Sequence, residues 1–402
     1  MADSGDVVVE MAGDVVDLGG LLKIIQKNYG TEKVEESAVV RFRPPFIQTP
    51  KHDARGDAIA LAMDHLLQRG VPLWASNLIG RSFVDAHVTD LQTAPVPFVD
   101  GVYDPIDASV WCREVIKALD HHMRKIAKGE IPPPVCVNCQ RPNICMRQKR
   151  FDKIVDFTAN EALKNDAFFA VFDGHNGVDC ATYASSHFHR CLVEENNYAS
   201  DLPDRVMKNT FKIIDQRLEA RCTNENLRGG TTAVCAWLRG RHLCIGWCGD
   251  SAAAVLRADS VRTLTSAHSP DVASEARRIQ DAGGMVLWVH GELRVNGILN
   301  LTRSLGDIDG RPMISPEPDT VSFELDGSEY LLMLACDGVW DMFHDTEVYN
   351  HIKQFVSSSS PKDYAKLSEY MTTRAKDAGA TDNLTMLCVF LRPVADLWDL
   401  FK

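Results

Sequence analysis

The sequence predicts an α+β protein in which packed β-sheets are covered by helices, with a helical region ahead of them. Short apolar runs rich in β-branched and aromatic residues begin after about residue 150, whereas the residues before about 130 show apolar positions at helical spacing. Helical segments separate the runs, an alternation typical of sheets packed against helices. The 402 residues exceed one ordinary domain, and the 45% apolar and 24% charged residues are ordinary globular values.

The N-terminal part, residues 1–135, is expected to be a helical region that regulates the protein or binds a partner. Two segments in it have amphipathic helical spacing, Asp57–Gln68 and Asp107–Lys128. Helices of this kind more often pack together or contact partner proteins than take part in catalysis. The proline-rich stretch Ile131–Val135 marks the boundary, so residues 136–395 are expected to form the second domain.

The second domain contains five apolar runs that are predicted strands and four segments that are predicted helices. The strands are Phe168–Phe172, Thr231–Leu238, His242–Trp247, Tyr330–Ala335 and Leu384–Leu391. The helices are Val178–Leu192, Leu202–Ala220, Ser274–Ala282 and Pro361–Ala378.

Charge and cysteine usage exclude some classes of protein. A net charge of -12 argues against a nucleic-acid binder, which needs a basic face. No apolar stretch approaches the roughly 20 residues that span a bilayer, so no membrane insertion is expected. The N-terminus lacks a secretory signal pattern, and many of the 12 cysteines lie inside apolar runs, as Cys235 and Cys388 do. A reducing, cytoplasmic location is therefore expected, with nuclear entry left open.

Aspartates recur where the predicted strands begin or end. Asp173 follows the run FFAVF, Asp250 follows HLCIGW, Asp337 follows YLLMLA with Asp341 shortly after it, and Asp382 leads into the last strand. One Asp-Gly after a strand is usually only a turn, but four such sites in one domain are expected to converge. Converging carboxylates repel one another and take up protons unless cations neutralise them.

Clustered carboxylates of this kind predict a metal-dependent hydrolase. All-oxygen sites suit the hard cations Mg²⁺ and Mn²⁺. Two such ions about 3.5–4 Å apart can share a carboxylate and activate a water for direct attack on phosphorus. His175, beside Asp173, could then protonate the leaving alkoxide.

Eight short motifs resemble, in order, those of the type 2C metal-dependent protein Ser/Thr phosphatases. They are FFAVFDGHNG (168–177), GGTTA (229–233), CGDS (248–251), RIQDAGG (278–284), RVNG (294–297), LTRSLGD (301–307), LACDGVWD (334–341) and TDNL (381–384). They extend over about residues 145–393, the whole expected catalytic domain. The helical extension, with the phrases FDGHNGVDCA and LLMLACDG, is most similar to the calmodulin-kinase phosphatase and FEM-2 branch. The resemblance implies a four-layer α-β-β-α sandwich with metals in a channel at one end.

The resemblance also implies roles for individual residues. Asp173 would bridge two metal ions, and the Gly174 carbonyl would bind the second of them. Asp337 and Asp382 would complete the first site. His175 would be the general acid.

Four further residues follow from the same resemblance. Asp250 and Asp341 would lie close to the two ions and could hold a weaker third one. Arg303 and Asp307 would be structural or would line the channel.

One position departs from the family pattern. Arg147 falls where the family grips the substrate phosphate, a role suited to a planar bidentate guanidinium, and Asp152 is the Asp of the acidic pair that follows. Phe151 stands where the family has a Glu that binds the second metal, and a phenyl ring cannot bind Mg²⁺. Asp152 would then help only through a water. An alternative register, with Arg141 as the phosphate arginine and Ile144-Cys145 at the acidic pair, fits worse.

Two functions therefore stay open. The first is a Mg²⁺- or Mn²⁺-dependent phosphatase acting on phosphoserine and phosphothreonine in protein substrates. The second is a pseudophosphatase that serves as a scaffold or partner-binding protein, with weak or no catalysis because of Phe151.

Two cysteine patterns suggest other chemistry. Cys235–Arg241 has the C-x₅-R spacing of cysteine-dependent phosphatases, but the cysteine lies mid-strand without a glycine-rich loop, so a structural role is expected. Cys136, Cys139 and Cys145 resemble a zinc knuckle whose fourth ligand is not evident nearby, although His121 or His122 could reach it.

Overall fold

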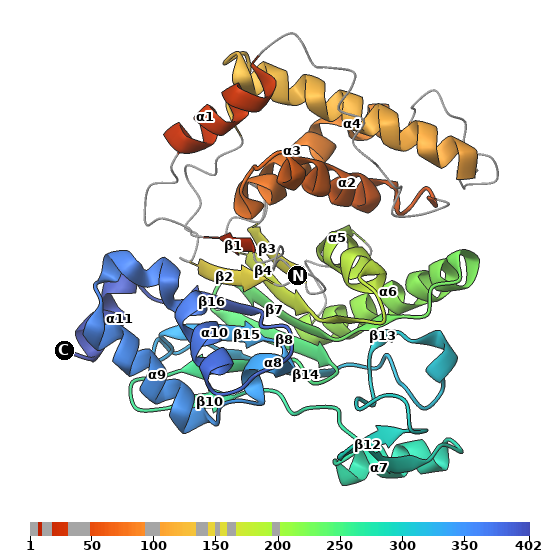
Figure 1. Ribbon diagram of the computed structural model, residues 1–402, viewed down its shortest axis with the longest axis vertical. Coiled ribbons are helices and arrows are strands. Elements are labelled where there is room, and N and C mark those ends of the chain that lie inside the picture. The colour runs from red at the N-terminus through yellow and green to blue at the C-terminus, as the bar shows by residue number, and fades with distance from the viewer. Residues whose placement is uncertain are drawn as a thin grey trace. The chain divides into compact units, whose positions relative to one another are not determined.

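The computed structural model describes most of the chain and divides it into two compact units. The described residues are 7–9, 18–30, 49–92, 105–133, 144–148, 153–158, 166–194 and 202–402. One unit is Asp14–Asn138, and the other combines Met1–Gly13 with Cys139–Lys402. Figure 1 shows the two units, the first helical and the second built on sheets. No helix among the described residues is long and apolar enough to cross a membrane.

The helical unit places its described helices around one apolar core. They are α1 (Leu18–Tyr29), α2 (Ala54–Gln68), α3 (Leu73–Gln92) and α4 (Pro105–Ala127). Ile25, Phe83 and Trp111 are fully buried in this core. The two helices predicted from periodicity correspond to α2 and α4. The sequence analysis missed α1 and α3. Helix α3 buries the polar Ser76 and Asn77 beside its apolar residues and so lacks a clear amphipathic pattern.

The second unit contains two antiparallel sheets. The strand order is β14-β8-β7-β4-β3 in the five-stranded sheet and β1-β2-β16-β15-β9-β10 in the six-stranded sheet. The five-stranded sheet consists of β3 (Lys153–Thr158), β4 (Asp166–Phe172), β7 (Ala233–Arg239), β8 (His242–Cys248) and β14 (Asp319–Glu324). The six-stranded sheet consists of β1 (Val7–Val9), β2 (Ile144–Gln148), β9 (Ala252–Leu256), β10 (Val261–Thr263), β15 (Leu331–Ala335) and β16 (Met386–Phe390).

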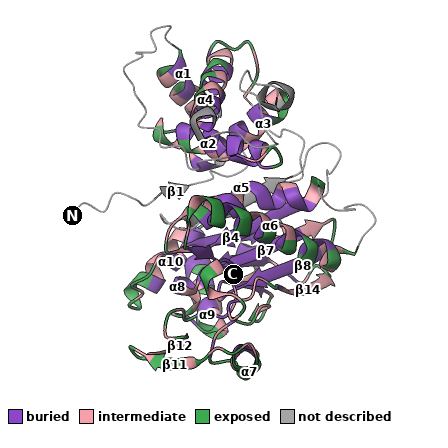
Figure 2. Ribbon diagram, turned by 90° about the vertical axis from the view of Figure 1, so that its right-hand side faces the viewer, coloured by how far each residue is buried: buried purple, intermediate pink, exposed green. Residues whose placement is uncertain are grey.

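Helices cover the outer face of each sheet. On the five-stranded sheet, α5 (Asp179–Glu194) and α6 (Pro203–Glu225) bury Phe188 and Phe211 against Phe168 and Trp237. The six-stranded sheet is covered by α8 (Asp337–Trp340), α9 (Asp345–Ser358), α10 (Leu367–Asp377) and α11 (Val394–Leu400). Figure 2 shows the buried strands β4, β7 and β8 and the buried sides of α5 and α6.

The inner faces of the two sheets form the middle of the sandwich. Phe169 and Val171 alternate along β4 with the residues that face the helices, and both are fully buried. The unit therefore has the four layers, α-β-β-α, that the family resemblance implies, and each of the five predicted strands is present.

The ends of the sheet unit differ from the expected boundaries. Residues Val7–Val9, placed by the sequence in the helical region, form β1 and pair with β2. Three valines are too short a run to identify as a strand from sequence. At the other end, α11 buries Leu397 and Trp398 in the core under the six-stranded sheet, so the unit continues past residue 395.

A small subdomain follows β10 and is held by a buried glutamate. It contains α7 (Ala273–Asp281) and the hairpin of β11 (Val286–Val289) and β12 (Glu292–Val295). Glu275 on α7 is 3% exposed and accepts hydrogen bonds from Arg303 Nε (3.1 Å), Arg278 Nη2 (2.8 Å) and Thr302 Oγ1 (2.7 Å). Burial alone would raise the pKa of Glu275, but these hydrogen bonds outweigh it and hold the pKa at about 2.

Glu275→Gln tests this anchor. Because the folded pKa is depressed, the charge stabilises the protein above the unfolded pKa, and the stabilisation is lost as pH falls toward 2. The variant is expected to lower the free energy of unfolding by about 3 kcal/mol at pH 7. Urea titrations between pH 7 and pH 3.5 should show a deficit that is constant above about pH 5 and shrinks below it. An equal deficit at all these pH values would contradict the electrostatic origin.

Candidate functional site

Strand ends from the two sheets meet at one edge of the sandwich. Asp173 follows β4 in the five-stranded sheet, while Cys336 and Asp337 follow β15 in the six-stranded sheet. Carboxylate oxygens of Asp173 and Asp337 and the Cys336 Sγ all lie within 4.8 Å of one another. The structure thus brings together two of the aspartates that the sequence analysis selected as metal ligands.

Cys336 has a structural role in this arrangement. Its Sγ donates to the Asn383 carbonyl oxygen at 3.3 Å and accepts from the Thr385 N–H at 3.2 Å. These bonds attach the segment that enters β16 to the end of β15. Asp382 directly precedes Asn383, so these bonds also bring Asp382 toward Asp337. The thiol positions the carboxylates, a role that the sequence analysis did not find.

Four carboxylates in the cluster interact electrostatically. Burial raises the pKa of Asp337 to about 7, and the charges of Asp250, Asp382 and Asp341 add to the rise. Burial, together with Asp341 and Asp382, raises the pKa of Asp250 to about 6. The pKa of Asp341 is also raised, first by partial burial and then by Asp382.

This donor set fits a hard cation. Oxygen-rich clusters of uncompensated like charge are the sites that Mg²⁺ and Mn²⁺ occupy in proteins. Asp173, Asp337 and Asp382 would provide carboxylate ligands for such an ion, with Asp250 and Asp341 beside them.

His175 is held by an aspartate from a distant part of the chain. Gly174 and His175 form β5, which pairs with β6 (Gly230–Thr231), and β6 pairs in turn with β13 (Leu305–Gly306). The His175 Nε2 lies 2.6 Å from the Asp307 Oδ2, and Asp307 is 5% exposed. A buried carboxylate in this position orients the imidazole. The two residues are 132 positions apart, and the sequence analysis placed Asp307 only as structural or channel-lining.

Gly230 makes this contact possible. A Cβ on Gly230 would lie 2.1 Å from the Asp307 Oδ2 and 2.7 Å from the His175 Nε2, so a larger residue would separate the pair. The two residues after Gly230 hold the backbone of Asp173 in place. The Thr231 Oγ1 and the Thr232 N–H both donate to the Asp173 carbonyl oxygen at 2.9 Å. The GGTTA motif therefore supports both the histidine and the aspartate.

The turn that carries Asp250 is supported by His268. The Gly249 N–H donates to the His268 Nδ1 at 3.1 Å, so the His268 Nε2 carries the proton that it donates to Asp319 at 3.2 Å. Arg303 pairs with Asp319 and with Glu275, which agrees with the structural role expected for Arg303.

The upstream candidates are described only in part. Arg147 lies on β2 opposite Met386 of β16, and its side chain is outside what the structure describes. Phe151, Asp152 and Arg141 lie outside the described residues. The second metal site therefore stays a prediction.

Neither cysteine pattern gains a catalytic role. Burial raises the pKa of the Cys235 thiol well above its usual range, so it carries no reactive thiolate at neutral pH. Cys136 and Cys139 lie outside the described residues, and the third cysteine of the zinc-knuckle pattern, Cys145, is on β2. Zinc binding stays untested.

Comparison with known proteins identifies the family. Residues 139–384 match the model of the protein phosphatase 2C family. The chain belongs to this family. It is 33% identical over 390 residues to protein phosphatase fem-2 of Caenorhabditis elegans, covering 90% of this chain and 85% of that protein. It is 35% identical over 237 residues to human protein phosphatase 1F, covering 58% of this chain and 51% of that protein.

Solved structures agree with this assignment. The structure of a C. elegans sex-determining protein superimposes with a TM-score of 0.81 at 30% identity, covering 96% of this chain and 97% of that one. Serine-threonine phosphatase 2C of Toxoplasma gondii matches with a TM-score of 0.56 at 20% identity, over 64% of this chain and 96% of that one. The second likeness shows the shared fold. The resemblance to the FEM-2 branch of type 2C phosphatases is confirmed.

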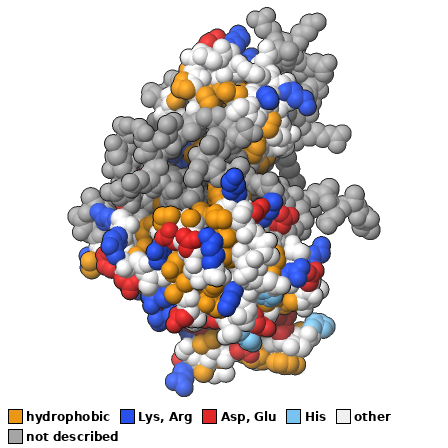
Figure 3. Space-filling model, turned by 90° about the vertical axis from the view of Figure 1, so that its left-hand side faces the viewer, with side chains coloured by type: hydrophobic (Ala, Val, Ile, Leu, Met, Phe, Trp, Pro, Cys, Tyr) orange, Lys and Arg blue, Asp and Glu red, His pale blue; other side chains and the backbone are white. Residues whose placement is uncertain are grey.

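On the face shown in Figure 3, acidic and basic side chains of the described residues are interspersed with apolar ones. Among the described residues, that face therefore has no large patch of only positive or only negative charge.

Asp307→Asn tests the histidine–aspartate pair. Asparagine fits the left-handed backbone of this position (φ 44°), so the fold should be kept. Loss of the carboxylate is expected to lower kcat about 10- to 100-fold for phosphoserine peptides, whose alkoxide leaving group needs a proton. Aryl phosphates with a good leaving group should lose much less. Asp309→Asn, at a neighbouring exposed position, is the control; an equal loss on both substrate types would contradict a role in proton donation.

Asp337→Asn tests the carboxylate cluster. The folded pKa of Asp337 is raised, so its charge is destabilising above that pKa, and this penalty disappears as pH falls toward the unfolded value. In chelator at pH 8, the variant is expected to be more stable than the parent by ~2 kcal/mol. Added Mn²⁺ should raise the Tm of the parent but not of the variant. The matched control is the exposed Asp259→Asn, and a chelator-treated Asp337→Asn less stable than the parent would refute the repulsion.

Proposed function

We propose that this chain is a catalytically active, Mg²⁺- or Mn²⁺-dependent phosphatase that hydrolyses phosphoserine and phosphothreonine in proteins. The observation that carries the proposal is the approach of Asp173 and Asp337 within 4.8 Å, beside the His175–Asp307 pair. Family membership alone would not require these groups to be kept in place.

The ligand roles follow the positions of the carboxylates. Asp173, Asp337 and Asp382 would hold the first ion, and Asp173 with the Gly174 carbonyl would hold the second. When bound, such ions lower the pKa of a water and offset the charge of the phosphate. Asp250 and Asp341 would bind a third ion or hold water near it, and this ion would bind more weakly than the other two because Asp341 is exposed.

The chain's own proton donor is His175. Its Nε2 donates to Asp307, which leaves Nδ1 as the nitrogen that can deliver a proton to the leaving alkoxide. Asp307 then keeps the ring oriented and balances the charge of the protonated form.

The substrate phosphate would be gripped by Arg147. Its strand β2 pairs with β16, with Arg147 opposite Met386, four residues after Asp382. A guanidinium there would bind phosphate oxygens in a bidentate fashion while the ions hold the others.

A pseudophosphatase is the second candidate, and Phe151 is the observation that favours it. Replacing a carboxylate ligand by a phenyl ring weakens the second ion's site to Asp173, the Gly174 carbonyl and waters, with Asp152 acting through a water. Mg²⁺ often binds with few protein ligands, which supports an active enzyme.

The helical unit, within residues 1–135 as first expected, would regulate the enzyme or bind a protein partner. We propose that the protein acts on phosphoprotein substrates in the cytoplasm, and nuclear entry stays open. The buried cysteines among the described residues, such as Cys235 and Cys244, support a reducing compartment.

Hydrolysis of an aryl phosphate across a Mn²⁺ titration separates the two candidates. The parent should show Mn²⁺-dependent turnover, and Asp173→Asn should show none. If turnover by the parent is no higher than turnover by Asp173→Asn, the proposed enzyme is ruled out and the pseudophosphatase is the remaining candidate.

Phe151→Glu sharpens the same experiment. The added carboxylate is expected to raise the rate and to lower the Mn²⁺ concentration at half-maximal activity by about tenfold. Phe151→Gln is the matched control, because it adds a polar side chain of the same size as Glu without the charge. An unchanged rate and metal response would show that Arg147–Asp152 is aligned wrongly with the family.

A further inference from the structure

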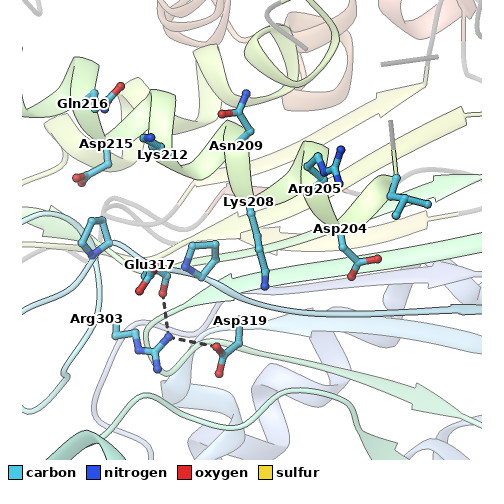
Figure 4. Close-up of a pocket in the computed structure, with 13 residues that line it drawn as sticks. Asp204, Arg205, Lys208, Asn209, Lys212, Asp215, Gln216, Arg303, Glu317 and Asp319 are labelled. Atoms are coloured by element: carbon cyan, nitrogen blue, oxygen red, sulfur yellow. Dashed lines mark hydrogen bonds and ion pairs between the residues drawn. The ribbon is translucent and has the colours of Figure 1, made fainter. Parts of the chain in front are cut away.

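A groove lies between α6 and the segment that leads into β14. Its volume is about 1050 Å³. Figure 4 shows its two walls: Arg205, Lys208 and Lys212 project from α6, and Glu317 and Asp319 lie opposite with Arg303. The mechanism proposed above uses none of the three cations.

The lining residues of α6 follow one face of the helix. Leu202, Arg205, Lys208 and Lys212 recur at spacings of three or four, which places them on successive turns of the same side. From Leu202 to Asp215 this face is about 20 Å long at 1.5 Å per residue. An extended peptide of about six residues has the same length.

The three cations on this face lack ion-pair partners among the described residues. Arg205, Lys208 and Lys212 are exposed, whereas the acidic residues beside them are engaged. Asp204 accepts a hydrogen bond from Ser322. Asp215 pairs with Arg311 at 2.6 Å.

The α6 side of the groove therefore presents three exposed cations, while the acidic residues beside them on the helix are engaged with Ser322 and Arg311. The opposite wall carries the acidic residues Glu317 and Asp319. Arg303 there is neutralised by Glu275 and Asp319, and Glu317 is exposed.

We propose that this groove binds an acidic segment of the phosphoprotein substrate in an extended conformation. Its acidic side chains would contact Arg205, Lys208 and Lys212, and an apolar side chain would cover Leu202, which is 68% exposed. The choice of occupant rests on the proposed phosphatase function.

A peptide fits these walls better than a nucleic acid does. Nucleic acid presents phosphates continuously along both sides, and Glu317 and Asp319 would repel one side of it. A peptide can place acidic side chains toward α6 and neutral or basic ones toward Glu317. The net charge of -12 also disfavours long polyanions.

The groove is connected to the catalytic histidine through one loop. At its inner end, the Asp215 Oδ1 accepts the Gly306 N–H at 3.1 Å. The next residue is Asp307, which holds His175. Arg303, in the same loop, lines the groove. One loop thus borders the groove and carries the partner of the proton donor.

The test uses the full chain and the double variant Lys208→Glu/Lys212→Glu. The probe is a fluorescein-labelled peptide of glutamates with one leucine, measured by anisotropy, which needs no turnover. The double variant is expected to weaken binding about tenfold or more, with a weaker salt dependence. The matched control is Lys353→Glu/Lys362→Glu, which makes the same change in charge at exposed positions on the six-stranded side.

Turnover provides the second measurement. The double variant should raise KM for a phosphoserine peptide with an acidic flank, but not for an aryl phosphate or a peptide with a neutral flank. If the parent fails to turn over the aryl phosphate yet binds the probe through Lys208 and Lys212, the proposed function fails and the groove stands.

Three results would overturn the groove proposal. The first is unchanged probe binding in the double variant when its thermal unfolding matches that of the parent. The second is an equal loss in the control variant, which would indicate only general attraction. The third is binding of a single-stranded oligonucleotide or an anionic vesicle, lost in the double variant, without binding of the peptide. If the double variant fails to fold, Lys208→Gln/Lys212→Gln replaces it, with a loss of about threefold expected.

Discussion

Like charge gathered at one edge of the sandwich is the constraint on which the rest of the site depends. Asp337 and Asp250 stay there although burial and neighbouring carboxylates raise their pKa values to about 7 and 6. A fold keeps such a cluster only if rigid elements hold it, since the carboxylates repel one another. Here the ends of β4 and β15, from opposite sheets, provide that rigidity, and Cys336 fastens the entry to β16.

A second set of hydrogen bonds extends this rigidity to His175. Thr231 and Thr232 hold the Asp173 carbonyl, while Gly230 leaves room for Asp307 to reach His175. Asp173 and His175 are thus attached to the same three-stranded sheet, β13-β6-β5. Because this sheet fixes both, a displacement of one would displace the other.

The sequence predicted the parts of this molecule that are local in the chain. Apolar runs located five of the strands, β4, β7, β8, β15 and β16, and aspartates at strand ends located the cluster. The His175–Asp307 contact could not be predicted, because it depends on how β13, β6 and β5 pair across 132 residues. Helix α3 was missed because its buried polar residues obscure the period, and β1 because three valines carry too little signal.

The loop from Arg303 to Asp307 joins the two halves of the proposed mechanism. Arg303 connects it to Glu275, Gly306 connects it to Asp215 at the end of the groove, and Asp307 connects it to His175. An acidic segment bound along α6, as proposed, would therefore border the loop that carries Asp307, the residue that orients His175. The proposed substrate binding along the groove and the proposed proton donation by His175 would share one short stretch of backbone, so selectivity for a flanking sequence would appear in kcat as well as in KM.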